Sequence, residues 1–278
     1  MATTRNFLIG ATASDPRNAV TIWNAIRRWF GDAGFPVDYA LYSTYDALCG
    51  ALLRGEVDIA WNAPMAHAQT LLVSDGACRT LAMRDTDDRV ATVIIARADS
   101  GIQQPADLRG KRVALGVPMS TELRLVPVHG LRAEGVDLEK DCELVDLDPR
   151  EYSNGVAWVD DFMIFDAVCN GDADAGAIFE PWLAHLLTKR ATKAAELPVI
   201  WRSKTFCHCA FTARPALESS VGDRFVKVLL AMNHADDPVV TEMMRLEHVK
   251  EWRVADETGW QGLMESIRAA DLVGKTFI

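Results

Sequence analysis

Two segments of the chain repeat one pattern of helix end, strand and helix start. LLRGEVDIAWNAP (52–64) and VCNGDADAGAIFEP (168–181) each contain a glycine, an aspartate three residues later, an apolar run and a proline. Glycine suits the left-handed end of a helix, and proline suits the first turn of the next one. We therefore expect Asn62 and Glu180 at strand carboxyl ends, where open α/β sheets bind ligands. Two ordinary βαβ units that recur without a shared function are the alternative.

The rest of the chain alternates short apolar runs with amphipathic segments, which is typical of an α/β protein with largely parallel sheets. A first helix is expected from a cap at Ser14 or Asp15 to Gly34, and the chain from Pro215 onward is expected to be mostly helical. The remaining expected strands are 6–11, 37–42, 57–61, 92–100, 112–117 and 142–147, and the remaining expected helices are 45–54, 64–73, 122–134 and 161–170.

Composition limits the partners of the protein. The 278 residues are 49% hydrophobic and carry a formal charge of −10. A negative charge repels phosphate backbones, so we expect no nucleic-acid partner. Apolar runs such as TVIIA (92–96) are far shorter than the roughly 20 residues that cross a bilayer, so we expect a soluble protein with no direct membrane insertion.

Two features bear on the compartment. The first 15 residues contain neither the apolar core of a signal peptide nor a cleavage site. The six cysteines are scattered through apolar surroundings, which favours reduced, buried thiols over a disulfide framework. Both features predict a cytoplasmic protein, with a periplasmic location as the alternative if a leader is absent from this sequence.

Residues 45–69 and 91–137 resemble the phosphate/phosphite/phosphonate (PhnD-type) substrate-binding proteins of ABC transporters, and the resemblance continues through 170–186 and 197–206. It implies an α/β, two-lobed type II periplasmic-binding-protein fold with crossing hinge strands. Residues 1–85 plus 210–278 would form lobe I and residues 88–205 lobe II, with the ligand cleft between the lobes.

The resemblance also implies an oxyanion clamp. Ser120 and Thr121 in PMSTELRLVP match the Ser-Thr-Ser clamp of the family at a helix start, and hydroxyls and free N–H groups at such a position attract anions. Ser120 as a plain helix cap is the alternative. Pro127 lies inside this expected helix, where it would produce a kink.

Three carboxylates are expected near the clamp. Glu122 stands where the family usually has a third hydroxyl, and Asp160 or Asp161 stands where many members have a histidine. Together with Glu180 they would repel a doubly charged phosphonate. They favour a ligand with a cationic or hydrogen-bond-donating part, such as an aminophosphonate, or a neutral polar metabolite. Glu122 pointing to solvent beside Arg124 is the alternative.

Other ligand contacts are expected on the first lobe. Thr12 and Ser14 follow the first strand, and Tyr45 matches a position near the cleft of the family. Helix capping explains Thr12 and Ser14 almost as well, and packing could explain Tyr45. Trp61 is expected to lie in the core.

TFCHCAF (205–211) lies where the resemblance places a strand crossing between the lobes. In a regular strand, Cys207 and Cys209 share one face and His208 lies on the other, so we expect no metal site there. His208 could face the cleft, or could be an ordinary core or surface histidine.

Two classes of function fit these features. The first is a non-catalytic binding protein that takes a small polar ligand, closes by hinge motion, needs no cofactor, and acts with an ABC-transporter membrane component or a regulatory protein. The second is a cytoplasmic enzyme on the same fold, of lyase, dehydratase or desulfinase type, with Cys207, His208, Asp160 and Glu122 as candidate catalytic groups. A cytoplasmic ligand sensor is a third possibility. No nucleotide-binding loop and no HExxH or CxxC motif occurs, which favours binding over catalysis.

Overall fold

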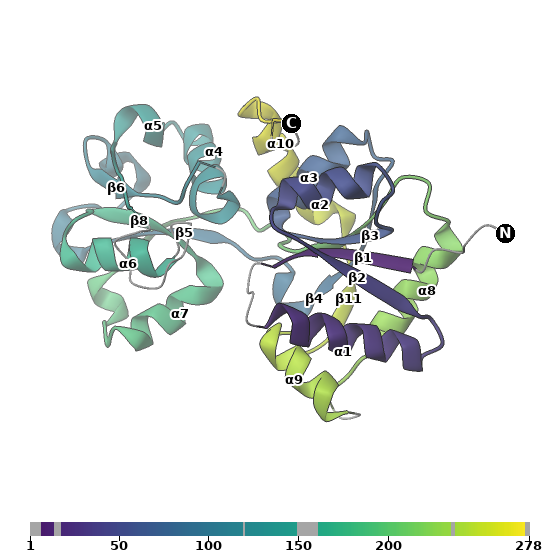
Figure 1. Ribbon diagram of the computed structural model, residues 1–278. Coiled ribbons are helices and arrows are strands. Elements are labelled where there is room, and N and C mark those ends of the chain that lie inside the picture. The colour runs from purple at the N-terminus through teal and green to yellow at the C-terminus, as the bar shows by residue number, and fades with distance from the viewer. Residues whose placement is uncertain (1–6, 14–17, 119, 149–160, 235–236, 276–278) are drawn as a thin grey trace. The chain divides into compact units, whose positions relative to one another are not determined.

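The chain folds into two compact units. The structure, a computed structural model, describes residues 7–13, 18–118, 120–148, 161–234 and 237–275 (Figure 1). Unit 1 contains residues 1–89 and 207–278, and unit 2 contains residues 90–206. The chain therefore passes from one unit to the other twice, at 89–90 and at 206–207.

Unit 1 is built on a six-stranded sheet. Its strand order is β11-β4-β10-β3-β1-β2. β1 runs parallel to β2 and β3, whereas β10 is antiparallel to both β3 and β4. The strands are β1 (Phe7–Thr12), β2 (Val37–Tyr42), β3 (Ile59–Asn62), β4 (Arg79–Arg84), β10 (Ala210–Ala213) and β11 (Trp252–Val254). β4 and β11 were not expected from the sequence, since β4 has a charged residue at each end and β11 is only three residues long.

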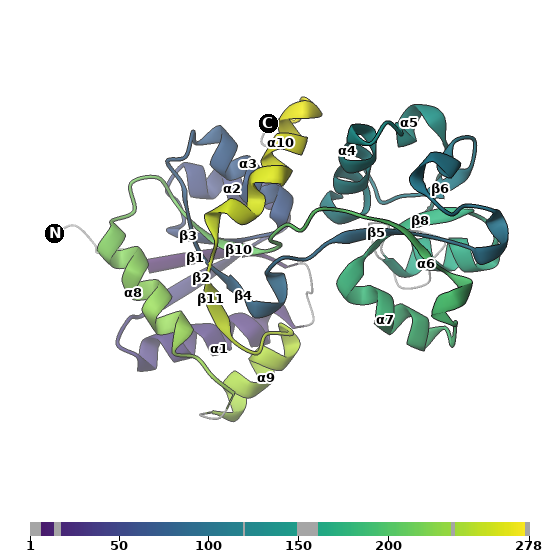
Figure 2. The same ribbon diagram turned by 180° about the vertical axis from the view of Figure 1, so that it is seen from behind.

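Helices cover both faces of this sheet (Figure 2). The helices α1, α8 and α9 lie on one face and bury a large core that includes Ile26, Phe30, Phe211 and Phe225. Burying one such side chain contributes about 1.5–3 kcal/mol. On the other face, α2 packs over β1 and β3, and α10 packs against α3. These helices are α1 (Ala19–Asp32), α2 (Tyr45–Leu53), α3 (Pro64–Val73), α8 (Ser219–Leu230), α9 (Pro238–Leu246) and α10 (Gln261–Ala269).

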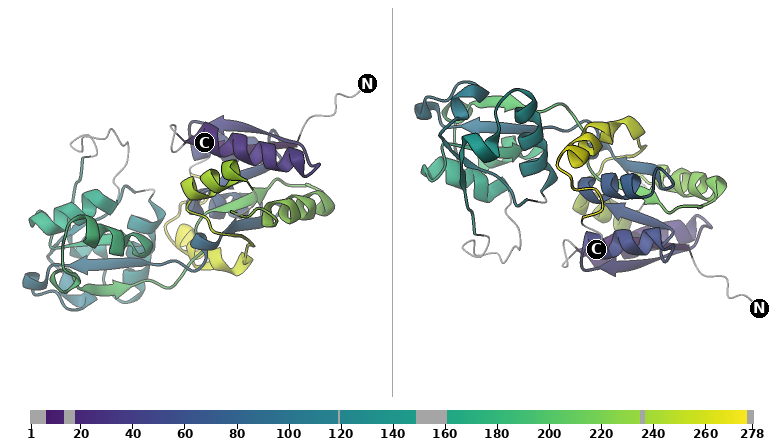
Figure 3. Two further views of the ribbon diagram at one scale, coloured as in Figure 1. Left: turned by 90° about the horizontal axis from the view of Figure 1, so that it is seen from below. Right: turned by 90° about the horizontal axis from the view of Figure 1, so that it is seen from above.

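Unit 2 repeats the same plan with five strands. Its order is β7-β6-β8-β5-β9, in which β6 runs parallel to β7 and β8, and β5 is antiparallel to β8. Among the described residues, α6 and α7 lie on one face of the sheet, and α4 and α5 lie on the other (Figure 3). The elements are β5 (Thr92–Ala96), β6 (Arg112–Ala114), β7 (Glu143–Val145), β8 (Ala175–Phe179), β9 (Val199–Arg202), α4 (Val126–Ala133), α5 (Leu138–Asp141), α6 (Asp161–Asn170) and α7 (Glu180–Lys189).

Short helical turns complete the two units. A π-helical turn, η4 (Thr121–Leu125), directly precedes α4. Elsewhere the described chain forms the 3-10 helices η1 (Asp85–Asp87), η2 (Ala98–Ser100), η3 (Pro105–Leu108), η6 (Ala194–Glu196) and η7 (Glu257–Trp260).

The repeated sequence pattern produces the same structure in both units. Gly55 and Gly171 follow α2 and α6 with φ of 73° and 82°, and Pro64 and Pro181 lie in the first turns of α3 and α7. These four expectations are confirmed. Each glycine ends its helix in the left-handed region, which costs a residue without a Cβ little.

The repeated aspartates, Asp58 and Asp174, fix the strand that follows each glycine. The Asp58 carboxylate accepts a hydrogen bond from the Leu8 N–H at 2.9 Å, and that of Asp174 accepts one from the Arg112 N–H at 3.0 Å. Each aspartate also pairs with an arginine, Asp58 with Arg214 at 3.0 Å and Asp174 with Arg112 at 2.8 Å. The repeat therefore encodes a strand junction, with the carboxylate joining two neighbouring strands.

Candidate functional site

One edge of the unit 2 sheet gathers polar side chains. Thr92 at the start of β5 pairs with Phe179 at the end of β8, and Val93 pairs with Arg202 at the end of β9. The carboxyl ends of β6, β8 and β9 therefore share this edge with the amino end of β5. The predicted site residues that follow β6 and β8 at this edge are Ser120, Thr121, Glu122 and Glu180.

The helix after β6 begins with a π-helical turn because of Pro127. Proline has no N–H, so the Leu123 carbonyl loses its helical partner and instead accepts from the Gly116 N–H at 2.9 Å. The Val126 N–H bonds to the carbonyl of Thr121, five residues back. The kink expected at Pro127 is thus a π turn, a feature frequent at functional sites.

The π turn also ties the helix start to β5. Because the Val126 N–H bonds to Thr121, the Glu122 carbonyl is available to the Thr92 hydroxyl, which donates to it at 2.7 Å. The Thr92 N–H donates to the Ser203 hydroxyl at 3.0 Å. Thr92 and Ser203 are both buried, so the hydrogen bond from Thr92 in β5, itself fixed by Ser203 directly after β9, holds the start of the helix in place.

Ser120 and Thr121 occupy the first positions of this helix. The Ser120 hydroxyl accepts from the Leu123 N–H at 3.3 Å, as a helix cap does, and can still donate its own hydrogen. Thr121 is buried. Since the first N–H groups of a helix have no partner within it, this helix start can bind an oxyanion. The capping role and the clamp role of Ser120 are therefore compatible.

Glu180 does not contribute an uncompensated charge to this edge. Its carboxylate receives two hydrogen bonds of 2.7 Å from the Arg202 guanidinium. The Asp161 carboxylate accepts from the Phe179 N–H at 2.7 Å, which places it at the end of β8. The sequence predicted that Glu180 would help to repel a doubly charged phosphonate, but the guanidinium of Arg202, 22 residues later in the chain, offsets its charge.

A second polar edge lies in unit 1, around Tyr45. The Tyr45 side chain starts α2 and hydrogen-bonds to Thr12 at the end of β1. Burial, together with the nearby Cys209, raises the pKa of Tyr45 to about 12, although the Thr12 hydrogen bond and the charges of His208 and Arg84 act in the opposite direction. These five side chains therefore lie close together, and the Tyr45 hydroxyl keeps its proton at neutral pH.

Arg84, at the end of β4, organises this edge. Its guanidinium lies 5.2 Å from the centre of the Trp61 ring and donates to both Asp87 oxygens, at 2.6 and 3.0 Å. It also donates to the Glu247 carboxylate at 3.1 Å. Burial opposes ionisation of Asp87, but hydrogen bonds from His208 and Arg84 outweigh it and hold the pKa of Asp87 below its usual value. Trp61 packs against the core as expected, with a half-buried ring.

His208 connects Asp87 to Cys209. Its Nδ1 lies 3.1 Å from Asp87 Oδ1 and 3.1 Å from Cys209 Sγ. The expectation that His208 and Cys209 lie on opposite faces is wrong, because residues 207–209 form no regular strand and β10 begins only at Ala210. The charged and polar groups thus form a chain from Arg84 through Asp87 and His208 to Cys209.

Asn62 lies inside unit 1 and not on its polar edge. It has no exposed surface, its Nδ2 donates to the Thr212 hydroxyl at 3.0 Å, and its Oδ1 accepts from Cys49 at 3.6 Å. His67 Nδ1 lies 2.7 Å from the same Thr212 hydroxyl. Although Asn62 ends β3 as predicted, its side chain points to the buried face, so the expectation of a direct ligand contact is wrong. Asn62 instead joins β3 to β10 through its hydrogen bond to Thr212, beneath the polar edge in the interior of unit 1.

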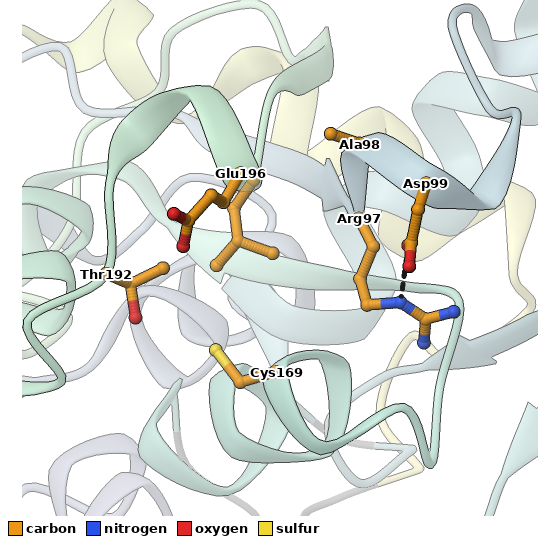
Figure 4. A pocket seen from close by; sticks show the side chains of 7 residues that line it. Arg97, Ala98, Asp99, Cys169, Thr192 and Glu196 are labelled. Carbon is orange, nitrogen blue, oxygen red and sulfur yellow. Dashed lines mark hydrogen bonds and ion pairs between the residues drawn. The ribbon is translucent and has the colours of Figure 1, made fainter.

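Unit 2 also contains a pocket of about 380 Å³ (Figure 4). Arg97, which follows β5, lines this pocket together with Asp99 and with Cys169 near the end of α6. Arg97 Nε donates to Asp99 Oδ1 at 2.9 Å. Arg97 also donates to the Ala173 carbonyl, just before β8. The pocket is therefore at the amino end of β8, opposite the end that carries Glu180.

Two predicted contacts, Ser14 and Asp160, lie outside the described residues. The sequence reasoning missed Arg84, Asp87, Cys209 and Arg202. A weak signal existed for two of them, since Arg84 and Arg202 each end an apolar run that leads to the same sheet edge as a predicted site residue. Among the described helices, none has the length and apolar character needed to cross a membrane.

Comparison with known proteins identifies the family and the fold of the chain. The family described as "ABC transporter, phosphonate, periplasmic substrate-binding protein" matches residues 9–258. The Phosphate-import protein PhnD of Mycolicibacterium smegmatis is 28% identical over 206 residues, which cover 72% of this chain and 62% of that protein. The chain thus aligns with less than two thirds of the length of this relative.

Solved structures share the fold. PhnD1 from Prochlorococcus marinus (MIT 9301), in complex with methylphosphonate, has a TM-score of 0.67 at 17% identity, with 96% of this chain and 98% of that chain covered. XAC2383 from Xanthomonas citri, bound to ATP, has a TM-score of 0.70 at 18% identity over 96% and 98%. The aliphatic sulphonate binding protein SsuA of Escherichia coli has a TM-score of 0.58 at 14% identity over 98% and 89%. The predicted α/β, type II periplasmic-binding-protein fold is confirmed, and the chain belongs to the phosphonate periplasmic substrate-binding protein family of ABC transporters.

Proposed function

We propose that the protein is a non-catalytic substrate-binding protein for a small phosphonate or phosphate-like oxyanion, which it delivers to the membrane component of an ABC transporter. The observation that carries the proposal is the helix start at Ser120 and Thr121, which the π turn and Thr92 hold in place. Hydroxyl and N–H donors at a fixed helix start recognise tetrahedral oxyanions without a counter-charge.

The pairing of Glu180 with Arg202 supports an anionic ligand. A carboxylate with two hydrogen bonds from a guanidinium repels an anion much less than an isolated one does. Tyr45 supports the same proposal from unit 1, since a hydroxyl that stays protonated can donate to an oxyanion. We propose Ser120, Thr121, Glu122 and Glu180 as the contacts from unit 2, and Thr12, Tyr45 and His208 as those from unit 1.

The two chain crossings are the proposed hinge. The chain connects the units at 89–90 and 206–207, and the Val90 and Phe206 backbones pair there with both hydrogen bonds at 2.9 Å. We expect the protein to respond to ligand by rotation about these two paired segments.

We further propose that this chain has the periplasmic location of its family. Fractionation of the native cells tests this location, and recovery of the protein in the cytosolic fraction would contradict it.

Isothermal titration calorimetry tests the ligand class. We expect one equivalent of inorganic phosphate or methylphosphonate to bind, and ethanesulfonate to bind more weakly. Since a hydrogen bond to a charged group contributes about 1.5–3 kcal/mol, Ser120→Ala and Thr121→Val should each weaken binding by about tenfold or more. Thr188→Ala, which removes an exposed hydroxyl on α7, is the matched control and should bind like the parent protein.

Two results would overturn the proposal. One is unchanged affinity in both Ser120→Ala and Thr121→Val. The other is chemical turnover, seen by phosphorus NMR as conversion of methylphosphonate during incubation with catalytic amounts of the protein, since a binding protein releases its ligand unchanged.

A further inference from the structure

Three side chains with different metal-binding atoms meet at the edge of unit 1. Asp87 ends the 3-10 helix η1, and His208 and Cys209 directly precede β10. One ligand atom from each of the three lies within 4.8 Å of the other two. Asp87 and Cys209 are buried, and the His208 side chain is 19% exposed, so an ion could enter from the side of the imidazole.

We propose that Asp87, His208 and Cys209 form a zinc-binding site, with an open fourth position for water or another ligand. Thiolate, imidazole and carboxylate are the three side-chain ligand types that Zn²⁺ uses. A thiolate disfavours Mg²⁺ and Ca²⁺, which prefer oxygen ligands. The proposed oxyanion clamp, Ser120 and Thr121, shares no residue with this zinc site, whereas His208 is also one of the proposed ligand contacts of unit 1.

Two of the three separations between the ligand atoms are close to those of a tetrahedral ion. With zinc bonds of about 2.0 Å to nitrogen and oxygen and about 2.3 Å to sulfur, a tetrahedron places neighbouring ligand atoms roughly 3.3–3.5 Å apart. His208 Nδ1 lies 3.1 Å from both Asp87 Oδ1 and Cys209 Sγ. These two separations need to grow by only a few tenths of an ångström, within the reach of χ rotations, while the Asp87–Cys209 separation, which is within 4.8 Å, must come to about 3.5 Å. On binding, Cys209 loses its thiol proton to solvent, and His208 binds through Nδ1 with its proton on Nε2.

Surrounding residues already hold the proposed ligands. Arg84 donates to both Asp87 oxygens, and the His208 backbone N–H donates to the Asp87 carbonyl at 2.9 Å. Trp260 Nε1 donates to the His208 carbonyl at 2.9 Å. Outer hydrogen bonds of this kind orient ligands and raise metal affinity.

The local charges permit a divalent cation despite Arg84. The zinc ion and Arg84 would bring three positive charges, which the Cys209 thiolate and the carboxylates of Asp87 and Glu247 balance. The hydrogen bonds of the Arg84 guanidinium go to the carboxylates of Asp87 and Glu247, so its positive charge is paired before any ion binds.

The site would join the two segments through which the chain leaves and re-enters unit 1. Asp87 lies two residues before the crossing that follows Arg89, and His208 lies directly after the return at Cys207. Bound zinc would therefore cross-link residues 121 positions apart in the chain and restrain both crossings on the unit 1 side.

Cobalt binding tests the proposal on the full chain. Protein stripped with a chelator and kept under a thiol-free reductant is titrated with Co²⁺, which gives a thiolate charge-transfer absorption in a site that contains cysteine. We expect this absorption at one equivalent, its loss on addition of Zn²⁺, and a higher midpoint of thermal unfolding with Zn²⁺. Cys209→Ser should remove the charge-transfer absorption, and His208→Ala should lower Co²⁺ affinity at least tenfold.

Cys207→Ser is the matched control. Cys207 is also buried and lies only two residues from Cys209, but it is outside the three-residue cluster, so this variant should keep the cobalt absorption and the zinc-dependent stabilisation. The proposal is overturned if the parent protein shows no charge-transfer absorption, or if Cys209→Ser retains it at full strength. Circular dichroism of the metal-free variants verifies that each one is folded.

Discussion

The imidazole of His67 and the hydroxyl of Thr212 lie 2.7 Å apart in the interior of unit 1, joined through Nδ1 and Oγ1. Nε2 of His67 lies 3.1 Å from the Thr80 hydroxyl, so both ring nitrogens have a hydroxyl partner. The Trp260 ring packs edge to face with the His67 ring, and their centres are 4.6 Å apart. The neutral imidazole is fully satisfied in this setting, and a protonated one would be a buried charge with no carboxylate beside it among these contacts.

This relationship predicts acid sensitivity. Burial lowers the pKa of His67 from 6.5 to about 3. Below pH 6.5, His67 binds a proton in the unfolded chain but not in the folded protein. The free energy of unfolding therefore falls by about 1.4 kcal/mol per pH unit toward pH 3. Above pH 6.5 His67 causes no such loss. Urea unfolding of His67→Gln across this range should show a shallower slope than that of the parent protein, and an unchanged slope would contradict the prediction.

Gly116→Ala should disturb the oxyanion clamp without adding charge. A Cβ on Gly116 would lie 2.7 Å from Leu123 Cβ and 2.9 Å from Ser120 Cβ, so the helix start must move. We expect a loss of about 1–3 kcal/mol in unfolding free energy and weaker methylphosphonate binding by calorimetry. At Gly262 nothing lies within 4 Å of an added Cβ, so Gly262→Ala should leave binding unchanged. Parent-like affinity in Gly116→Ala would contradict the role given to this contact.

Removal of Arg202 should unmask the charge of Glu180. In Arg202→Met the Glu180 carboxylate has lost its two guanidinium hydrogen bonds, so we expect methylphosphonate affinity to fall about tenfold. The double variant Arg202→Met with Glu180→Gln should regain most of that affinity. If the double variant binds as weakly as Arg202→Met, Arg202 itself contacts the ligand and the neutralising role is wrong.

Tyr45 predicts an alkaline transition. Burial raises its pKa from 10.0 to about 12, so the protonated form is favoured by the fold. The corresponding stability is complete below pH 10 and is lost as the pH rises from 10 to about 12, because the unfolded chain releases this proton first. A spectrophotometric titration of the folded protein should show a late tyrosinate step that is missing in Tyr45→Phe. A late step of equal size in Tyr45→Phe would assign it to another tyrosine.

The sequence predicted strand and helix ends better than the partners of side chains. The glycines, aspartates and prolines of the two repeated segments act locally, through φ angles and hydrogen bonds to the nearest strand, and they lie as the pattern indicated. Helix 122–134 was also correct in position, but its first turn is π-helical because Pro127 removes one N–H. Proline inside the expected helix was the sequence signal for this departure from regular α-helix.

Pairings between distant residues were beyond the sequence pattern. Glu180 meets Arg202 only because β8 and β9, which flank β5 and both run antiparallel to it, end at the same edge of the sheet. Asp87 meets His208 because β4 and β10 are antiparallel neighbours, so the end of β4 lies beside the start of β10. The same register turned Asn62 inward, since its neighbour Ala210 and the buried Thr212 lie on the strand beside it. Residue type and strand position indicate which sheet edge holds the polar side chains. The pairing register of the strands determines which of these side chains point to that edge.

The two crossings of the chain also fix an order of events during synthesis. Residues 90–206 form one uninterrupted stretch, so unit 2 is complete when it leaves the ribosome. Unit 1 must wait for β10, the strand that lies between β3 and β4 in its sheet and comes from the last quarter of the chain. During that interval β3 and β4 have unpaired edges, and a nascent chain paused after residue 206 should be held in solution by a folded unit 2 next to an incomplete unit 1.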